Sequence, residues 1–452
     1  MEKNLTSGSV LKNIIWFSLP YLLSYFLQTL YGMADLYIIG QFEGVNDITA
    51  VSVGSQVMHM VTVMIVGLAM GATVHIGQAI GANRKEDASK YIGNTVTMFL
   101  IGSVIIAGIL IGFVDNIVAV MATPVEAVEG TKMYLTICFV GIPFITAYNI
   151  ISSIFRGLGD SKSPMYFIAV ACVANIGLDY LFMGALNMGA AGAALGTTIS
   201  QTISVVVALL VILKRKTGLS LHKNDFRLQR SVMGRILRIG VPVALQDGFI
   251  QIAFLIITII ANKRGLDDAA AVGIVEKLIC MLFLVPSSML SAVSALAAQN
   301  IGAGKHDRAA KTLKYATLIC VGFGIIATIA IQFFAEPIMA MFSDKAEVIT
   351  LGSQYFRGYI FDCIFAGVHF CFSGYFCAYG KSGVSFLHNC LSIVLVRVPG
   401  AYFASKCFAN TLLPMGLAAA GGSLLSVIVC VVAYVILKKR FGEEYYEYKD
   451  KV

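Results

Sequence analysis

Long apolar stretches recur along the whole chain, and they restrict its fold more than any other feature of the sequence. Each stretch is about 20 or more residues long, which is enough to cross a hydrocarbon layer of about 30 Å as a helix. We count twelve, at residues 13–41, 50–80, 92–114, 131–155, 163–186, 190–213, 237–262, 271–300, 314–335, 352–379, 384–407 and 412–437. The sequence therefore predicts an all-α membrane protein with twelve transmembrane helices.

The composition supports a membrane protein rather than a soluble domain. Charged residues make up 13% of the chain and apolar residues 58%, whereas soluble domains average about 25% charged residues. The first stretch is too long for a signal peptide and lacks a small-residue cleavage pattern, so we expect it to be retained as a helix. All ten cysteines fall in predicted spans, without metal or redox spacing, and we expect them to pack as small apolar residues.

Lysine and arginine are distributed unequally between the predicted loops. The termini and the even-numbered loops hold most of them, with the densest run at 213–238, and cytoplasmic loops carry such an excess. The opposite, predicted outer face has six: Lys132, Lys263, Arg264, Lys277, Lys345 and Lys406. We predict a multi-pass protein of the cell membrane with both termini in the cytoplasm. The net charge of +8 then reflects solvated loops, and no nucleic-acid partner is expected.

The second half of the chain repeats the first. "GQAIGANRKEDASK" at 77–90 aligns with "AQNIGAGKHDRAAK" at 298–311, and with a one-residue slip Pro20 aligns with Pro242. Six helices return the chain to its starting side, so two such halves are related by an axis along the membrane normal and can enclose a central cavity. We predict a first lobe at 1–213, a cytoplasmic basic linker at 214–236, a second lobe at 237–440 and a cytoplasmic tail at 441–452.

Two aspartates of the first lobe lie inside predicted spans, Asp35 and Asp179. An acidic residue near the centre of a membrane helix costs about 2.5 to 3.5 kcal/mol, so it needs a compensating role or a wet location. The interiors of the first-lobe spans hold no lysine or arginine to pair with them. Each carboxyl must therefore be protonated, face water or meet a cationic ligand. Asp115 lies near a span end, where a hydrated and inactive position is expected.

Neighbouring polar residues extend this candidate site. Asn175 precedes Asp179 by four residues, so both side chains lie on one face of a helix, one turn apart. Thr197 on the next span can add a hydroxyl. Pro20 lies inside the first span, where a proline bends a helix and removes a backbone donor. We predict a proton-exchanging carboxyl site formed by Asp35, Asn175, Asp179 and Thr197, with a helix bend at Pro20.

The second lobe has acidic and basic residues together. Asp247, Glu276 and Asp362 occur with Arg357 and Arg397, so ion pairs that hold helices together and a second ion or substrate site are both open interpretations. His369 and His388 are interpreted as hydrogen-bonded interior residues rather than ligands. The pattern offers no catalytic site and no protein-bound metal or cofactor.

The order and spacing of several motifs resemble those of the multidrug and toxic compound extrusion family. They are Pro20 and Asp35 on the first span, "IGQAIGANRKEDA", "FRGLGDSKSP", "NIGLDYLF", "MGAAGAALGTTISQ" and "AQNIGAGKHDRA". The similarity covers essentially the whole chain and is greatest to the bacterial branch related to the DNA-damage-inducible protein DinF.

The resemblance implies two six-helix lobes and export of cationic, amphipathic organic compounds by antiport with protons or sodium. It implies that Asp35, Asn175, Asp179 and Thr197 form the ion site and that the first helix bends at Pro20. Asp362 roughly matches a sodium-linked acidic position of another branch. The acidic partner of that site on the seventh helix is not clearly present, because Gln246 and Asp247 stand near that region instead.

We therefore expect a monomeric secondary antiporter, not an enzyme, that exports organic cations in exchange for protons. Sodium coupling by the same fold is the nearest alternative. A flippase for a lipid-linked precursor is a second alternative, which would need basic side chains in the cavity to bind pyrophosphate. An intramembrane enzyme is the third, and "GAGKH" at 302–306 lacks the earlier glycine and the following Ser or Thr of a phosphate loop.

Overall fold

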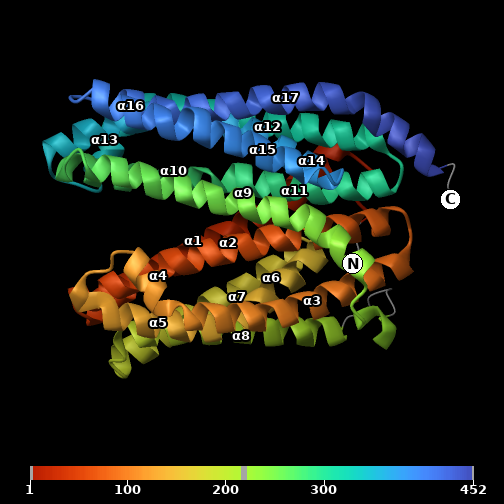
Figure 1. The fold of residues 1–452 in the computed structure, drawn as a ribbon, viewed down its shortest axis with the longest axis horizontal. Coiled ribbons are helices and arrows are strands. Elements are labelled where there is room, and N and C mark those ends of the chain that lie inside the picture. The colour runs from red at the N-terminus through yellow and green to blue at the C-terminus, as the bar shows by residue number, and fades with distance from the viewer. Residues whose placement is uncertain (1–3, 215–220, 450–452) are drawn as a thin grey trace. The chain divides into compact units, whose positions relative to one another are not determined.

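The computed structural model describes residues 4–214 and 221–449, and within these ranges the regular structure is entirely helical (Figure 1). Among the described residues, eleven helices are long and apolar enough to span a membrane, and a further pair bent by 50°, Val125–Val140 with Ile142–Gly157, makes a twelfth if it counts as one span. The predicted all-α membrane fold is confirmed. Several spans are broken or end in π-helical turns, which the hydropathy of the sequence did not indicate.

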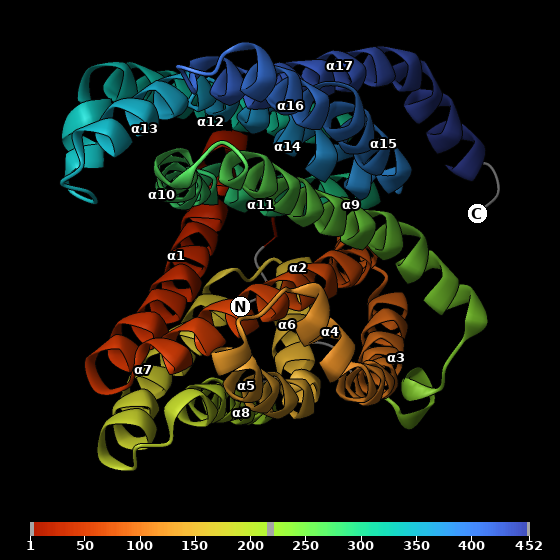
Figure 2. The ribbon, with the colours of Figure 1, turned by 60° about the vertical axis from the view of Figure 1, so that its left-hand side comes forward.

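Residues 4–214 form eight α-helices. They are α1 (Val10–Phe42), α2 (Val45–Gly81), α3 (Lys85–Gly112), α4 (Val114–Val120), α5 (Val128–Val140), α6 (Ile142–Gly157), α7 (Lys162–Asp179) and α8 (Gly189–Lys214). A 3₁₀ turn, Val125–Ala127, precedes α5, and a π-helical turn, Tyr180–Ala185, continues α7. Helices α5 and α8 lie side by side (Figure 2) and pack with α2.

Residues 221–449 form nine more. They are α9 (Arg230–Asn262), α10 (Leu266–Leu282), α11 (Leu284–Gly302), α12 (His306–Ala340), α13 (Ala346–Tyr359), α14 (Asp362–Ala378), α15 (Ser382–Ser392), α16 (Val398–Cys407) and α17 (Leu413–Lys449). A π-helical turn, Ile393–Arg397, joins α15 to α16. Helix α14 packs with α11, α12 and α17.

The chain divides into two compact units whose bounds differ from the predicted lobes at their first helices. Unit 1 comprises residues 1–4 and 19–244, and unit 2 comprises residues 5–18 and 245–452. The start of α1 therefore belongs to unit 2, and the start of α9 to unit 1. Helix α17 continues to Lys449 through most of the predicted tail. Residues 215–220 of the predicted linker and 450–452 of the tail lie outside the described residues.

The described part of the linker is fixed to α3 by one buried amide. Asn94 Nδ2 donates to the carbonyl of Asp225 at 3.0 Å, and Asn94 Oδ1 accepts from the backbone N–H of Gln229 at 2.7 Å. Thr97 Oγ1 adds a bond to the carbonyl of Phe226 at 2.9 Å. Residues 221–229 therefore form a defined connection to unit 1 rather than a charged spacer alone.

Small residues allow the helices of unit 2 to pack backbone against backbone. A Cβ atom on Gly358 of α13 would overlap the carbonyl oxygen of Leu413, and one on Gly416 of α17 would overlap that of Tyr355. Close approach at small residues is a principal source of association between membrane helices, because lipid tails remove the hydrophobic drive. The two glycines thus set the spacing of α13 and α17.

We expect Gly358→Ala to destabilise the protein, because the new methyl meets a backbone atom that cannot move alone. Overpacking of this kind costs about 1 to 3 kcal/mol. The measurement is the midpoint of thermal unfolding in detergent, and Gly102→Ala is the matched control, since Gly102 is also helical but has open space around its Cβ position. Equal midpoints for the two variants would contradict the packing argument.

Candidate functional site

Two buried carboxyl groups face each other in unit 1. Asp35 of α1 is 5% exposed and Asp179, the last residue of α7, is 0% exposed. The two carboxyl groups are close enough to interact electrostatically, and Asn175 lies beside them. A hydrogen bond between two carboxyl groups requires a proton on one of them.

Polar groups from α7 and α8 complete the cluster. Thr197 Oγ1 of α8 donates to Asp35 Oδ2 at 3.2 Å, and Asn175 Nδ2 makes a long contact of 3.5 Å with Asp179 Oδ1. The four residues predicted for the ion site, Asp35, Asn175, Asp179 and Thr197, are thus brought together. Their role in ion coupling stays a prediction.

The cluster has more acceptors than donors. Asp35 Oδ1, Asn175 Oδ1 and Asp179 Oδ2 are buried and have no hydrogen-bond partner in the described part of the chain. None of the ion pairs between described residues involves Asp35 or Asp179. Buried oxygen acceptors are costly unless a donor or a cation satisfies them. This arrangement suits a proton or a small cation as the missing partner.

Residues that the sequence did not single out for the ion site also shape it. A Cβ atom on Gly196 of α8 would collide with Asp179 Oδ1, so a larger residue there would have to displace the carboxyl group or α8. Tyr31 lies near Gln201 and Asp35. Helical spacing could have indicated both, because Tyr31 precedes Asp35 by four residues and Gln201 follows Thr197 by four.

The backbone changes its pitch at the site. Helix α7 ends at Asp179 and continues as a π-helical turn over Tyr180–Ala185. In unit 2 the corresponding fifth span contains the other π-helical turn, which ends at Arg397. π-Helical turns are rare in proteins overall, and those that occur are often found at functional sites. In both units a buried charged residue stands at the border of one.

In unit 2 the buried acid is paired inside the protein. Arg397 Nη2 donates to Asp362 Oδ2 at 2.9 Å and to the hydroxyl of Tyr359 at 2.6 Å. The guanidinium also lies over the Phe254 ring, 5.4 Å from its centroid. Asp362 is 0% exposed, so the Arg397 guanidinium neutralises a carboxyl group that is shielded from solvent.

The other charged residues predicted for the second lobe separate into different places. Glu276 accepts a hydrogen bond from Thr258 at 3.2 Å and lies near Arg397. Arg357 instead pairs with Glu336 at 3.3 Å in an exposed position. Asp247 is half-buried on α9 and makes no ion pair with the described residues of this cluster.

The two histidines of unit 2 lie next to each other inside the protein. The Ser373 hydroxyl and His388 Nε2 share a hydrogen bond of 2.9 Å, and the rings of His369 and His388 are 5.4 Å apart. The second-lobe residues thus contain one tight ion pair and several separate polar positions.

Comparison with known proteins places the chain in a family. The MatE family model matches residues 20–181 and again residues 242–403, so the two matches begin at Pro20 and Pro242. The chain belongs to the MatE family. It is therefore a membrane transporter and not an enzyme, as its sequence predicted, while the DinF-related branch stays a prediction.

Individual relatives cover most of the MatE chain. A probable multidrug resistance protein of Bacillus subtilis, YpnP, is 29% identical over 87% of this chain and 88% of its own. An FAD transporter of Shewanella oneidensis is 23% identical, with 88% of both chains covered. A multidrug resistance MATE transporter solved in an outward-facing conformation has a TM-score of 0.89 at 22% identity, covering 97% of each chain, which supports the fold.

We expect Gly196→Ala to impair the function of the carboxyl pair while the helices still form. The new Cβ meets Asp179 Oδ1 and must displace the carboxyl or α8. Gly177→Ala is the matched control, because Gly177 lies two residues before Asp179 and has open space around its Cβ position. The measurement is the efflux rate of an organic cation at equal membrane expression, and equal rates would contradict the proposed packing.

We also expect Asp362→Leu or Arg397→Met alone to destabilise the protein, because each leaves one buried charge unpaired. Breaking a buried pair costs about 3 to 5 kcal/mol, whereas apolar replacement of both partners is often neutral or stabilising. Thermal unfolding of the two single variants and the double variant measures this difference. A double variant no more stable than the singles would contradict a structural ion pair.

Proposed function

We propose that this MatE transporter exports organic cations in exchange for protons. The observation that carries the proposal is the buried pair of Asp35 and Asp179, which has no basic partner among the described residues of unit 1. Two carboxylates about 4 Å apart repel each other by about 4 kcal/mol at an effective dielectric constant of 20. The pair therefore favours a bound proton or a bound cation over the fully charged state.

Competition for the carboxyl pair supplies the coupling. Protonation removes the negative charge that holds a cation, so a proton arriving from outside weakens cation binding and promotes release. Proton loss toward the cytoplasm restores the anionic site for the next cation. By linkage, the proton lowers cation affinity by the same factor by which the cation lowers proton affinity. This reciprocity is the thermodynamic requirement of an antiporter.

Pro20 can connect the carboxyl pair to a change in helix shape. It lies in α1, 15 residues before Asp35, or about 22 Å along a helix. Proline has no N–H to donate and crowds the preceding turn, so bending costs less there than elsewhere in α1. We propose that protonation of Asp35 or Asp179 changes the packing of α1 and is accommodated by a bend at Pro20.

The pairing in unit 2 supports ion coupling in unit 1. Arg397 already occupies the cationic position beside Asp362, so a coupling ion there would have to displace a guanidinium that also bonds Tyr359. Sodium coupling at the carboxyl pair is the alternative, because carboxylates and neutral oxygens also bind sodium. Multidrug export as the substrate class is taken from the names of relatives such as YpnP.

Asp35→Asn and Asp179→Asn test the proposal directly. We expect each variant to export a fluorescent organic cation no faster than cells lacking the protein, because asparagine keeps the size but neither carries charge nor exchanges a proton. Efflux is measured in cells with the proton and the sodium gradients collapsed separately. Wild-type export that stops only when the proton gradient is lost supports proton coupling.

Asp115→Asn is the matched control, since Asp115 is exposed and pairs with Lys132 at 2.8 Å at the end of a span. We expect its efflux rate to equal that of the wild type. Full export by both Asp35→Asn and Asp179→Asn would overturn the carboxyl-pair mechanism. Export that follows the sodium gradient would assign sodium instead, and no cation export by the wild type would favour another substrate such as a lipid-linked precursor.

A further inference from the structure

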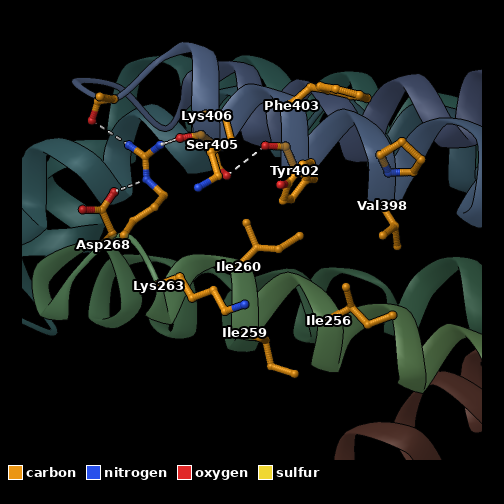
Figure 3. Close-up of a pocket in the computed structure, with 13 residues that line it drawn as sticks. Ile256, Ile259, Ile260, Lys263, Asp268, Val398, Tyr402, Phe403, Ser405 and Lys406 are labelled. Carbon is orange, nitrogen blue, oxygen red and sulfur yellow. Dashed lines mark hydrogen bonds and ion pairs between the residues drawn. The ribbon is translucent and has the colours of Figure 1, made fainter.

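A groove with a cavity volume of about 630 Å³ lies in unit 2, where α9 and α16 end (Figure 3). Its walls are apolar side chains, among them Ile256 and Ile259 from α9 and Val398 and Phe403 from α16. Ile259 is 45% exposed and Phe403 63% exposed, so the groove is open to its surroundings. Exposed apolar walls of this kind are suited to hold the acyl chain of a lipid.

Arg264 closes the end of the groove and is fully engaged in doing so. Its Nε donates to Asp268 at 2.7 Å, and its terminal nitrogens donate to the carbonyls of Ser405 at 2.8 Å and Ala409 at 2.8 Å. These bonds tie the end of α9 to the last turn of α16 and neutralise Asp268 (Figure 3). Neither Arg264 nor Asp268 therefore contributes net charge to the groove.

Two further lysines from opposite walls line the groove. Lys263 follows the end of α9, and Lys406 lies in the last turn of α16 (Figure 3). Both are exposed, and among the described residues neither makes an ion pair. The net charge of the groove is thus positive, from two amines that no acidic residue of the described ranges neutralises.

These lysines stand out among the cations of the predicted outer face. Lys132 pairs with Asp115, and Lys345 pairs with Asp267. Lys277 lies on α10, outside the groove. The groove therefore concentrates two of the unpaired cations on a face where the sequence places few.

The order of charged and apolar residues along the groove matches that of a phospholipid, with the charge at one end and an apolar stretch next to it. Ile256 precedes Lys263 by seven residues, and Val398 precedes Lys406 by eight, so the apolar walls extend about 10 to 12 Å from the amines along the helices. Lysines at helix ends sit at the headgroup level, while the apolar turns below them face acyl chains. An anionic headgroup at the amines would place its chains along the walls.

We propose that this groove binds an anionic phospholipid, with the headgroup phosphate held by Lys263 and Lys406 and an acyl chain along Ile256, Ile259 and Phe403. A zwitterionic lipid brings its own cation toward the two amines and binds less well. The site lies wholly within unit 2 and does not depend on the proposed export function.

Native mass spectrometry of the full-length protein in detergent tests the site, with phosphatidylglycerol and phosphatidylcholine titrated separately. We expect wild-type protein to bind phosphatidylglycerol more tightly than phosphatidylcholine. Lys263→Gln with Lys406→Gln should weaken phosphatidylglycerol binding roughly tenfold or more, since each interfacial lysine contributes about 1 kcal/mol with anionic lipid. Phe403→Glu, which adds a negative charge to the apolar wall, should weaken it as well.

Lys277→Gln with Lys345→Gln is the matched control, because it removes the same charge outside the groove. We expect its phosphatidylglycerol affinity to equal that of the wild type. Equal affinity of the groove variant and the wild type, or equal binding of both lipids by the wild type, would overturn the proposal. Displacement of phosphatidylglycerol by an equal concentration of inorganic phosphate would also overturn it, because the site would then recognise the free anion.

Discussion

The contact between Asp35 and Asp179 is the constraint on which the rest of unit 1 depends. Two carboxyl groups are buried together with unpartnered oxygens and without a basic side chain, in a setting where each uncompensated charge costs several kcal/mol. Gly196 lets α8 approach closely enough to enclose the pair, and Thr197 orients Asp35 from the same helix. The described residues thus bring the helices close together around two carboxyl groups without giving them a basic partner.

Unit 2 has a similar arrangement of helices, but its buried acid Asp362 forms an ion pair with an arginine of the same unit. Asp362 meets Arg397, which a π-helical turn and an aromatic shell from Tyr359 and Phe254 hold in place. Arg397 is part of the chain and cannot be exchanged for a proton or a free cation. Its pairing with Asp362 therefore stabilises helix packing and does not bind or release an ion. Duplication of the fold, visible in the paired matches at 20–181 and 242–403, thus coexists with different chemistry in its two copies.

The features that could be predicted from the sequence are those determined by residues close together in the chain. The recurring apolar stretches predicted the membrane spans, and the aligned motifs predicted the repeat. The four-residue interval between Asn175 and Asp179 predicted that their side chains lie together. The approach of Asp35 was suggested only by resemblance, because α1 meets α7 through tertiary packing. The same limit applies to Arg357, which pairs with Glu336 on α12, and to Gly196, whose role depends on a neighbouring helix. Breaks such as the 50° bend between α5 and α6 leave hydropathy unchanged.

The prolines stand where each lobe's first helix passes from one compact unit to the other. The start of the chain is fixed in unit 2, because Lys305 Nζ donates to the carbonyl of Thr6 at 2.8 Å and Arg308 Nη1 to that of Gly8 at 2.9 Å. Asp35 lies in unit 1, and the unit boundary at residues 18 and 19 is next to Pro20. Helix α9 begins in unit 1 and continues in unit 2, the reverse of α1, and its boundary at residues 244 and 245 lies just after Pro242. Proline bends a helix more readily than other residues do, so α1 and α9 each have a readily deformed position next to the unit boundary.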